Sequence, residues 1–249
     1  MLQTKNGIDE NGSSSIGPWL KKAIAAAVLG IFIPAVIALG ISVWDDRKYY
    51  IVSLIIILLS MIPFALKFEK RKPQARELVT LAAMTAISVA GRAAFYMLPQ
   101  FKPMVALVMI TGIAFGCESG FISGAMTAFV SNFIFGQGPW TPWQMEALGL
   151  MGFFAGLLFH RRDGRLPKLL PLLIFGGLGT LIIYGLIVDT STVFTAYSKI
   201  TWELAAAAYA SGFVFNLIHA AATVIFLLIL ARPMLKKLNR IQVKFGLLE

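Results

Sequence analysis

The sequence contains few charged residues for its length. Only 14% of its 249 residues are charged and 58% are hydrophobic, whereas about a quarter of an average soluble domain is charged. Such a composition excludes an ordinary soluble domain. It predicts an integral membrane protein of the all-α class, whose apolar segments cross a lipid bilayer as helices.

Cysteine and histidine are almost absent. The single cysteine, Cys117, excludes an intrachain disulfide and a cysteine-rich metal site, and His160 and His219 are the only histidines. The chain has neither a GxxxxGK[ST] phosphate loop nor an HExxH motif. We therefore expect no metal, no other cofactor and no enzyme activity. A membrane enzyme acting on lipid would need a nucleophile or a metal cluster that the chain does not offer.

Long apolar segments are plentiful instead. They predict eight transmembrane helices, at about residues 19–44, 49–66, 77–98, 103–116, 119–135, 143–159, 169–188 and 204–230. We divide the chain into a disordered tail, two additional helices, a six-helix substrate-binding domain and a second tail, at residues 1–18, 19–72, 73–238 and 239–249. The first apolar segment is expected to remain as a membrane anchor, because it is longer than a signal-peptide core and no cleavage pattern follows it.

The positive charges predict the orientation. Of the 22 lysines and arginines, 17 fall in loops and tails on one side of the predicted spans. This asymmetry places both termini in the cytoplasm and the segments at 99–103, 135–143 and 189–203 outside. Because the basic residues sit in clusters between apolar runs, the net charge of +10 indicates topology and not nucleic-acid binding.

Polar residues gather toward the outer ends of the core spans. A charged group at membrane depth costs about 2.5–3.5 kcal/mol on insertion scales, so Arg92 predicts a site unless its side chain reaches the interface by snorkelling. The tryptophans could equally be anchors at the membrane interface. Asn216 and His219 could equally form a hydrogen bond between helices. The candidate substrate-binding residues are Arg92, Tyr96, Gln100, Lys102, Asn132, Gln137, Trp140, Trp143, Gln144, Asn216 and His219.

Small residues recur at fourfold spacing on four spans. Most of them are expected to let helices of this chain approach one another closely, in particular Gly112, Gly116, Gly120, Gly124, Ala128, Gly152 and Gly156. The stripe Ala82, Ala86 and Ala90 differs because it begins at the cytoplasmic edge. A partner protein could dock on that stripe.

From about Arg76 to Leu238 the chain resembles the substrate-binding S components of energy-coupling factor (ECF) vitamin transporters. The resemblance lies in the six spans, the alanine stripe and the outer loops rich in polar and aromatic residues. The segments GRAAFYMLPQFKP and VSNFIFGQGPWTPWQM, which begin at Gly91 and Val130, are similar to one branch of these components, some of which are assigned to cobalamin or related compounds.

The resemblance implies a receptor in a cell membrane, most simply the bacterial plasma membrane, that captures a micronutrient at its outer face. It further implies delivery by toppling in the membrane, with a transmembrane coupling subunit that contacts Ala82, Ala86 and Ala90, and with two cytoplasmic ATPases. The two additional N-terminal helices depart from the family's pattern. The alternative is a stand-alone secondary transporter, which fits less well because the two halves show no evident repeat and only Glu146 offers a mid-span acid.

Overall fold

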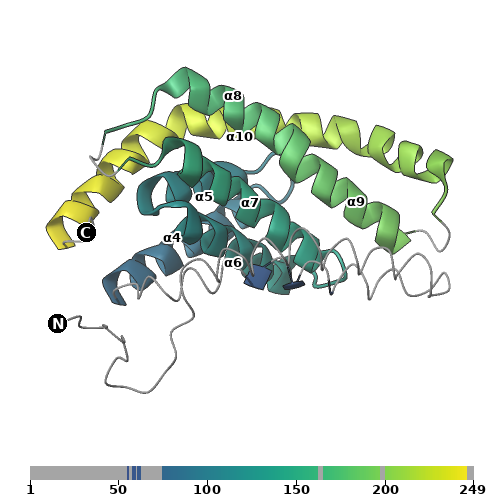
Figure 1. Ribbon diagram of the computed structural model, residues 1–249, viewed down its shortest axis with the longest axis horizontal. Coiled ribbons are helices and arrows are strands. Elements are labelled where there is room, and N and C mark those ends of the chain that lie inside the picture. The colour runs from purple at the N-terminus through teal and green to yellow at the C-terminus, as the bar shows by residue number, and fades with distance from the viewer. Residues whose placement is uncertain are drawn as a thin grey trace, which may run out of the picture.

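The computed structural model describes residues 75–161, 165–196 and 200–245, together with positions 55, 58, 59, 61 and 62. The described residues form helices and no strand, which confirms the all-α class for this part of the chain (Figure 1). The predicted tail and the span at 19–44 lie outside the described residues, as does most of the span at 49–66. From residue 75 onward the elements are α4 (Ala75–Ala94), α5 (Met104–Phe115), α6 (Cys117–Phe135), α7 (Thr141–Phe159), α8 (Leu169–Gly179), η2 (Thr180–Tyr184), α9 (Gly185–Ala196) and α10 (Trp202–Phe245).

Each of the six predicted core spans corresponds to a helix or to a run of joined helices. In the described part of the chain, three segments are long and apolar enough to cross a membrane, at Ala75–Ala94, Leu169–Thr195 and Trp202–Phe245. The helix α5 is apolar but has only 12 residues, so it spans roughly 18 Å, less than the hydrocarbon thickness of about 30 Å. The count of eight spans therefore stays a prediction.

The segments α8, η2 and α9 form one continuous helical run that is longer than predicted. The sequence suggested an outer loop from Asp189 onward, and this boundary is wrong because α9 continues to Ala196. The extra turns pack against the rest of the molecule, since Ser191 and Val193 are buried and the ring of Phe194 stacks on Trp143. The run contains a π-helical turn at η2, a feature that often occurs at functional sites.

Glycines bring α5, α6 and α7 into close contact. A Cβ atom at Gly152 would overlap the backbone of Gly120, and one at Gly112 would overlap the backbone of Gly152. All 12 residues of α5 are buried, so α5 forms the centre of the described core. The internal packing predicted for these glycines is thereby confirmed. In contrast, Ala82, Ala86 and Ala90 lie on the exposed face of α4.

The helix α10 runs well past the predicted end of its span at residue 230 and through Pro233. Its last turns remain attached to the core, because Leu235 and Leu238 are buried and Gln242 donates a hydrogen bond of 2.7 Å to the carbonyl oxygen of Ala114. The end of α10 thus covers one end of the molecule. Figure 1 shows it in yellow, beyond α8.

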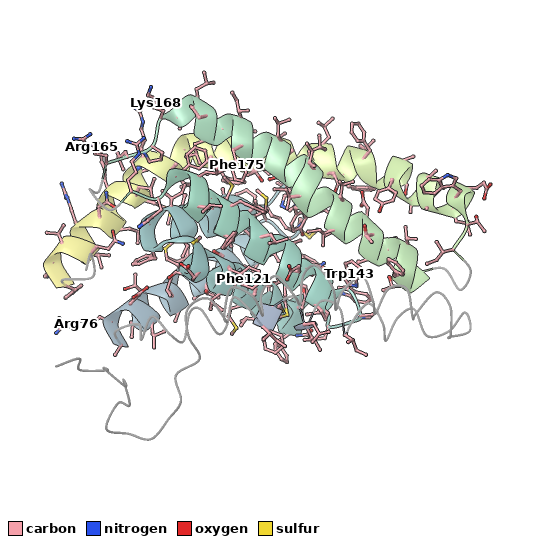
Figure 2. All side chains as sticks on the ribbon, in the orientation of Figure 1. Arg76, Phe121, Trp143, Arg165, Lys168 and Phe175 are labelled. Carbon is pink, nitrogen blue, oxygen red and sulfur yellow. The ribbon has the colours of Figure 1, made fainter. Side chains whose placement is uncertain are left out.

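Positive charges collect at this same end. Figure 2 places Arg76, Arg165 and Lys168 there, whereas Trp143 lies toward the other end. The exposed face of the last turns of α10 adds Lys236, Lys237 and Arg240. Among the described residues, these cations therefore gather at one end of the molecule, and the orientation of that end in a membrane stays a prediction.

Candidate ligand-binding site

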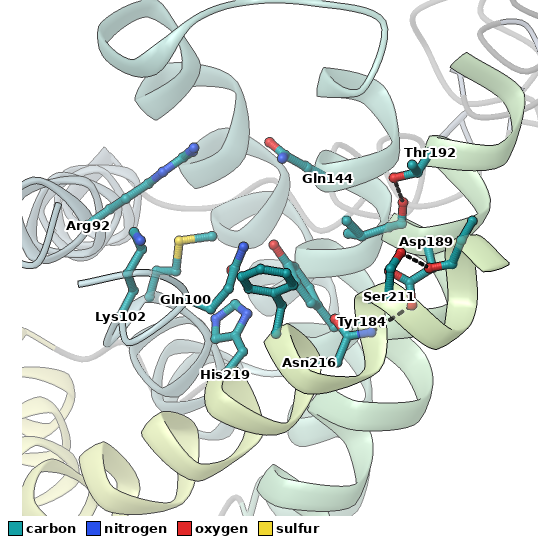
Figure 3. Close-up of a pocket in the computed structure, with 15 residues that line it drawn as sticks. Arg92, Gln100, Lys102, Gln144, Tyr184, Asp189, Thr192, Ser211, Asn216 and His219 are labelled. Atoms are coloured by element: carbon teal, nitrogen blue, oxygen red, sulfur yellow. Dashed lines mark hydrogen bonds between the residues drawn. The ribbon is translucent and has the colours of Figure 1, made fainter. Parts of the chain in front are cut away.

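A cavity of about 330 Å³ opens between the loop after α4, the start of α7, η2, α9 and α10 (Figure 3). Its volume falls at the lower end of the range of about 300–1,000 Å³ that is usual for small-molecule sites. The lining residues are Arg92, Gln100, Lys102, Met104, Gln144, Tyr184, Val188, Asp189, Thr192, Ala208, Ser211, Gly212, Phe215, Asn216 and His219. The cavity combines both signs of charge, several amides and two aromatic rings.

Arg92 is held at the end of α4 by groups on α6. Its Nη1 donates hydrogen bonds to Ser131 Oγ at 2.6 Å and to Asn132 Oδ1 at 2.8 Å. The guanidinium also lies 4.9 Å above the ring of Phe135, close enough for a cation–π attraction. These contacts satisfy one guanidinium nitrogen and leave donors for a ligand, since a guanidinium carries five N–H groups.

Asn132 connects this arginine to α7. The amide is fully buried, and its Nδ2 donates to Thr141 Oγ1 and to Gln144 Oε1, both at 2.9 Å. The hydroxyl of Thr141 in turn donates to Gln137 Oε1 at 2.9 Å. This network fixes the side chain of Gln144 and leaves its NH₂ group as a donor at the cavity wall.

The loop between α4 and α5 supplies Gln100 and Lys102. Gln100 has a φ of 54°, a left-handed conformation that is uncommon for any residue except glycine. Lys102 Nζ donates to the carbonyl oxygen of Leu98 at 3.1 Å. Burial and the neighbouring charge of Arg92 lower the pKa of Lys102 from its ordinary value. The loop therefore adds a second cation on the same side of the cavity as Arg92.

The opposite wall is formed by α9 and α10 and contains an acid. Asp189 is only 8% exposed, and its Oδ2 accepts a hydrogen bond of 2.7 Å from Asn216 Nδ2. Gly185 and Gly212 make room for this pair, because a Cβ atom at either position would lie within 2.8 Å of the side chain of Asn216 or Asp189. Figure 3 shows Asp189 across the cavity from Arg92 and Lys102.

His219 and Tyr184 lie between these two walls. Their rings meet edge to face with centroids 4.8 Å apart, and both side chains are buried. His219 Nε2 has no hydrogen-bond partner among the described residues. Because a buried nitrogen normally finds a partner, this atom is a natural contact for a bound molecule. The π-helical turn of η2 ends at Tyr184 and thereby places its ring in the cavity.

The predicted binding residues separate into three groups. Those that line the cavity are Arg92, Gln100, Lys102, Gln144, Asn216 and His219. Asn132 lies behind the wall and supports it. The residues that do not line the cavity are Tyr96, Gln137, Trp140 and Trp143.

Two of the aromatic residues outside the cavity pack on other rings. Tyr96 stacks on Phe135 with centroids 5.2 Å apart, and Trp143 stacks on Phe194 at 5.7 Å. Trp140 is 41% exposed. The exposure of Trp140 fits the alternative role as an interface anchor, whereas Trp143 packs inside the molecule.

Sequence reasoning missed Tyr184, Asp189, Thr192 and Ser211. A tyrosine inside an apolar span and hydroxyl residues in a helix are common packing elements, so neither stood out. Asp189 follows the apolar run of the predicted fifth span, so it was assigned to the outer loop and not to a binding site. Within the described residues, no group of three or more histidine, cysteine or acidic side chains is placed to hold a metal ion.

The comparisons with known proteins give one family. The family model described as "ECF-type riboflavin transporter, S component" matches residues 72–239. This match covers the whole of the described helical core from α4 to most of α10. No curated protein and no solved structure matches the chain.

Proposed function

Because the chain belongs to the S components of ECF-type transporters, we propose that it captures a riboflavin-like micronutrient at the outer face of a cell membrane. It then delivers the ligand inward together with a membrane coupling subunit and two ATPases. The family match begins at residue 72. We accordingly keep the six-helix substrate-binding domain at residues 73–238 as part of the proposal, and the additional helices predicted within 19–72 precede most of the matched segment.

The chemistry of the cavity carries this proposal. Riboflavin has a planar ring system, an edge with two carbonyl groups, and a chain that bears hydroxyl groups. The cavity offers donors from Arg92 and Lys102, aromatic surface from Tyr184 and Phe215, and an acid at Asp189. Each part of the vitamin therefore has a complementary group in the same cavity.

Size favours a flavin over a corrinoid. The sequence resemblance suggested cobalamin or a related compound, and the name of the family model refers to riboflavin. A corrinoid is several times larger than a flavin, whereas the cavity holds about 330 Å³. We accordingly propose a flavin as the ligand in place of cobalamin.

The charge distribution supports an outward-facing site. Arg165 and Lys168 lie at the end of the molecule that the last turns of α10 cover. Since cytoplasmic loops are enriched in lysine and arginine, that end faces the cytoplasm in our proposal. The cavity, which lies between the other ends of α4 and α7, then opens toward the outside.

The molecule that copurifies with the protein tests the proposed ligand. The full chain is purified in detergent, and the released small molecules are identified by mass spectrometry and by the visible absorption of a flavin. Riboflavin in an amount close to that of the protein is the expected result. Recovery of a corrinoid, or uptake that continues in ATP-depleted cells that keep a proton gradient, would contradict the proposal, the latter in favour of a secondary transporter.

Replacing Arg92 with alanine is expected to weaken riboflavin binding by about 10- to 100-fold. The change removes a positive donor from the cavity and leaves Asn132 without one of its partners, and a hydrogen bond to a charged group contributes about 1.5–3 kcal/mol. Riboflavin fluorescence quenching by the purified variant measures the effect. Trp140→Ala is the control, because Trp140 is half-exposed and does not line the cavity. Equal losses in both variants would argue against this site.

A further inference from the structure

The two walls of the cavity have opposite hydrogen-bonding character. On one side, Arg92 and Lys102 can only donate hydrogen bonds. On the other side, the hydroxyl of Ser211 already donates to the carbonyl oxygen of Ala208 at 2.9 Å, and that of Thr192 to the carbonyl oxygen of Val188 at 3.3 Å. With their protons engaged in the helix, these two hydroxyl oxygens turn acceptor lone pairs to the cavity. A ligand must therefore present acceptors to the first wall and donors to the second.

Asp189 is the strongest acceptor on the second wall. A carboxylate has about four acceptor positions, and the described residues use one of them, through Asn216 Nδ2 at 2.7 Å. No positively charged side chain in the described part of the chain pairs with it. A buried acid on a membrane-spanning helix is costly to keep, and such residues usually serve a ligand or an ion. No other described group occupies the remaining acceptor positions of Asp189.

The backbone around Asp189 is shaped to hold the carboxylate in place. At Gly212 a Cβ atom would lie 2.6 Å from Asp189 Cγ, and at Gly185 it would lie 2.8 Å from Asn216 Nδ2. Any larger residue at either position would displace the pair. Two glycines on facing helices thus admit one carboxylate and the amide that orients it.

The geometry points to Asp189 as a specificity residue. It accepts hydrogen bonds from a hydroxylated, uncharged end of the ligand and disfavours a ligand with a phosphate at that end. This assignment rests on the proposed function as a flavin receptor. It orients riboflavin with its carbonyl edge toward Arg92 and Lys102 and its hydroxylated chain toward Asp189. Chain hydroxyls donate to the carboxylate, whereas a phosphate would bring a second negative charge next to it.

Three flavins test the assignment against the full chain and the variant Asp189→Asn. The ligands are riboflavin, riboflavin phosphate, and lumiflavin, which keeps the ring and replaces the chain with a methyl group. We expect the unmodified protein to bind riboflavin about tenfold or more tightly than either of the others, which is the size of one hydrogen bond to a charged group. In Asp189→Asn, riboflavin should weaken about tenfold, lumiflavin should stay unchanged, and riboflavin phosphate should no longer be disfavoured.

Two further variants make the experiment decisive. Glu203→Gln removes one negative charge from the exposed start of α10 and is expected to leave all three affinities unchanged. Gly212→Ala keeps every charge but displaces the Asp189 carboxylate. It should therefore weaken riboflavin and leave lumiflavin unchanged, as Asp189→Asn does, while riboflavin phosphate stays disfavoured, and it supplies this test even if Asp189→Asn does not fold.

The outcomes separate the inference from the proposed function. If riboflavin binds but all three flavins bind the unmodified protein equally, or if Asp189→Asn weakens riboflavin and lumiflavin to the same extent, the role of Asp189 is refuted and the flavin receptor stands. If no flavin binds the unmodified protein, the proposed function fails and the inference fails with it.

Discussion

Replacing Ala86 with leucine is expected to abolish uptake while leaving ligand binding intact. Ala86 lies on the exposed face of α4 between Ala82 and Ala90, and none of these three alanines lines the cavity. Small residues at this spacing let two helices approach until their backbones nearly touch, and a leucine side chain holds them apart. If the coupling subunit docks on this stripe, as the sequence predicts, the change is expected to prevent docking without altering the cavity.

Two measurements on the same variant separate these effects. Riboflavin binding to the purified protein is expected to match the unmodified chain, and riboflavin uptake by cells that contain the coupling subunit and ATPases is expected to fall to background. Ala221→Leu is the matched control, because Ala221 is an exposed alanine on α10. Normal uptake by Ala86→Leu would exclude docking through the alanine stripe.

Replacing Gly152 with valine is expected to prevent stable folding. A Cβ atom at this position would lie 2.6 Å from the carbonyl carbon of Gly120 and 2.9 Å from a methyl group of Val108. Backbone cannot move aside as a flexible side chain can, so α6 and α7 would have to separate along their whole contact. Overpacking usually costs about 1–3 kcal/mol, and the backbone overlap places this change at the upper end or beyond.

Size-exclusion chromatography and thermal unfolding of the detergent-purified variant measure this loss. The expected result is aggregation, or an unfolding temperature far below that of the unmodified protein. Gly177→Ala is the control, because a Cβ atom there would meet no backbone and only one methyl group, that of Val224 at 3.2 Å. A Gly152→Val protein as stable as the unmodified chain would show that α6 and α7 do not pack as described.

Much of the fold could be predicted because a membrane restricts the chain more strongly than water does. Long apolar segments have to be helices, so the six core helices were placed close to their observed positions. Helix ends were less predictable. The sequence pattern ended the fifth span before Asp189, but α9 continues to Ala196, and its added turns bury Val193 and stack Phe194 on Trp143. Past residue 230, α10 continues because its apolar residues still have core to pack against.

The candidate site was predictable only in part, for a physical reason. Arg92 and Lys102 are charged residues between long apolar segments, so they are easily noticed in the sequence. Asp189, Thr192 and Ser211 line the cavity only because α9 packs against α10 in one register. That register depends on tertiary packing around Gly185 and Gly212. The tryptophans show the reverse case. They attract attention in the sequence, yet neither Trp140 nor Trp143 lines the cavity.

The accessibility of a single cysteine in the cavity tests the location of the binding site most directly. Cys117 is the chain's only cysteine, so a Cys117→Ser background allows one thiol to be placed at will. Ser211→Cys puts it on the cavity wall, and Thr201→Cys puts it at an exposed position just before α10. A membrane-impermeant thiol reagent is added from outside to each reconstituted protein, with and without riboflavin, while fluorescence quenching confirms that the ligand binds.

The account predicts that the reagent labels both positions from outside and that riboflavin protects the cysteine at 211 but not the one at 201. Bound riboflavin that leaves labelling at 211 unchanged would contradict it, because the ligand would then occupy some other part of the molecule.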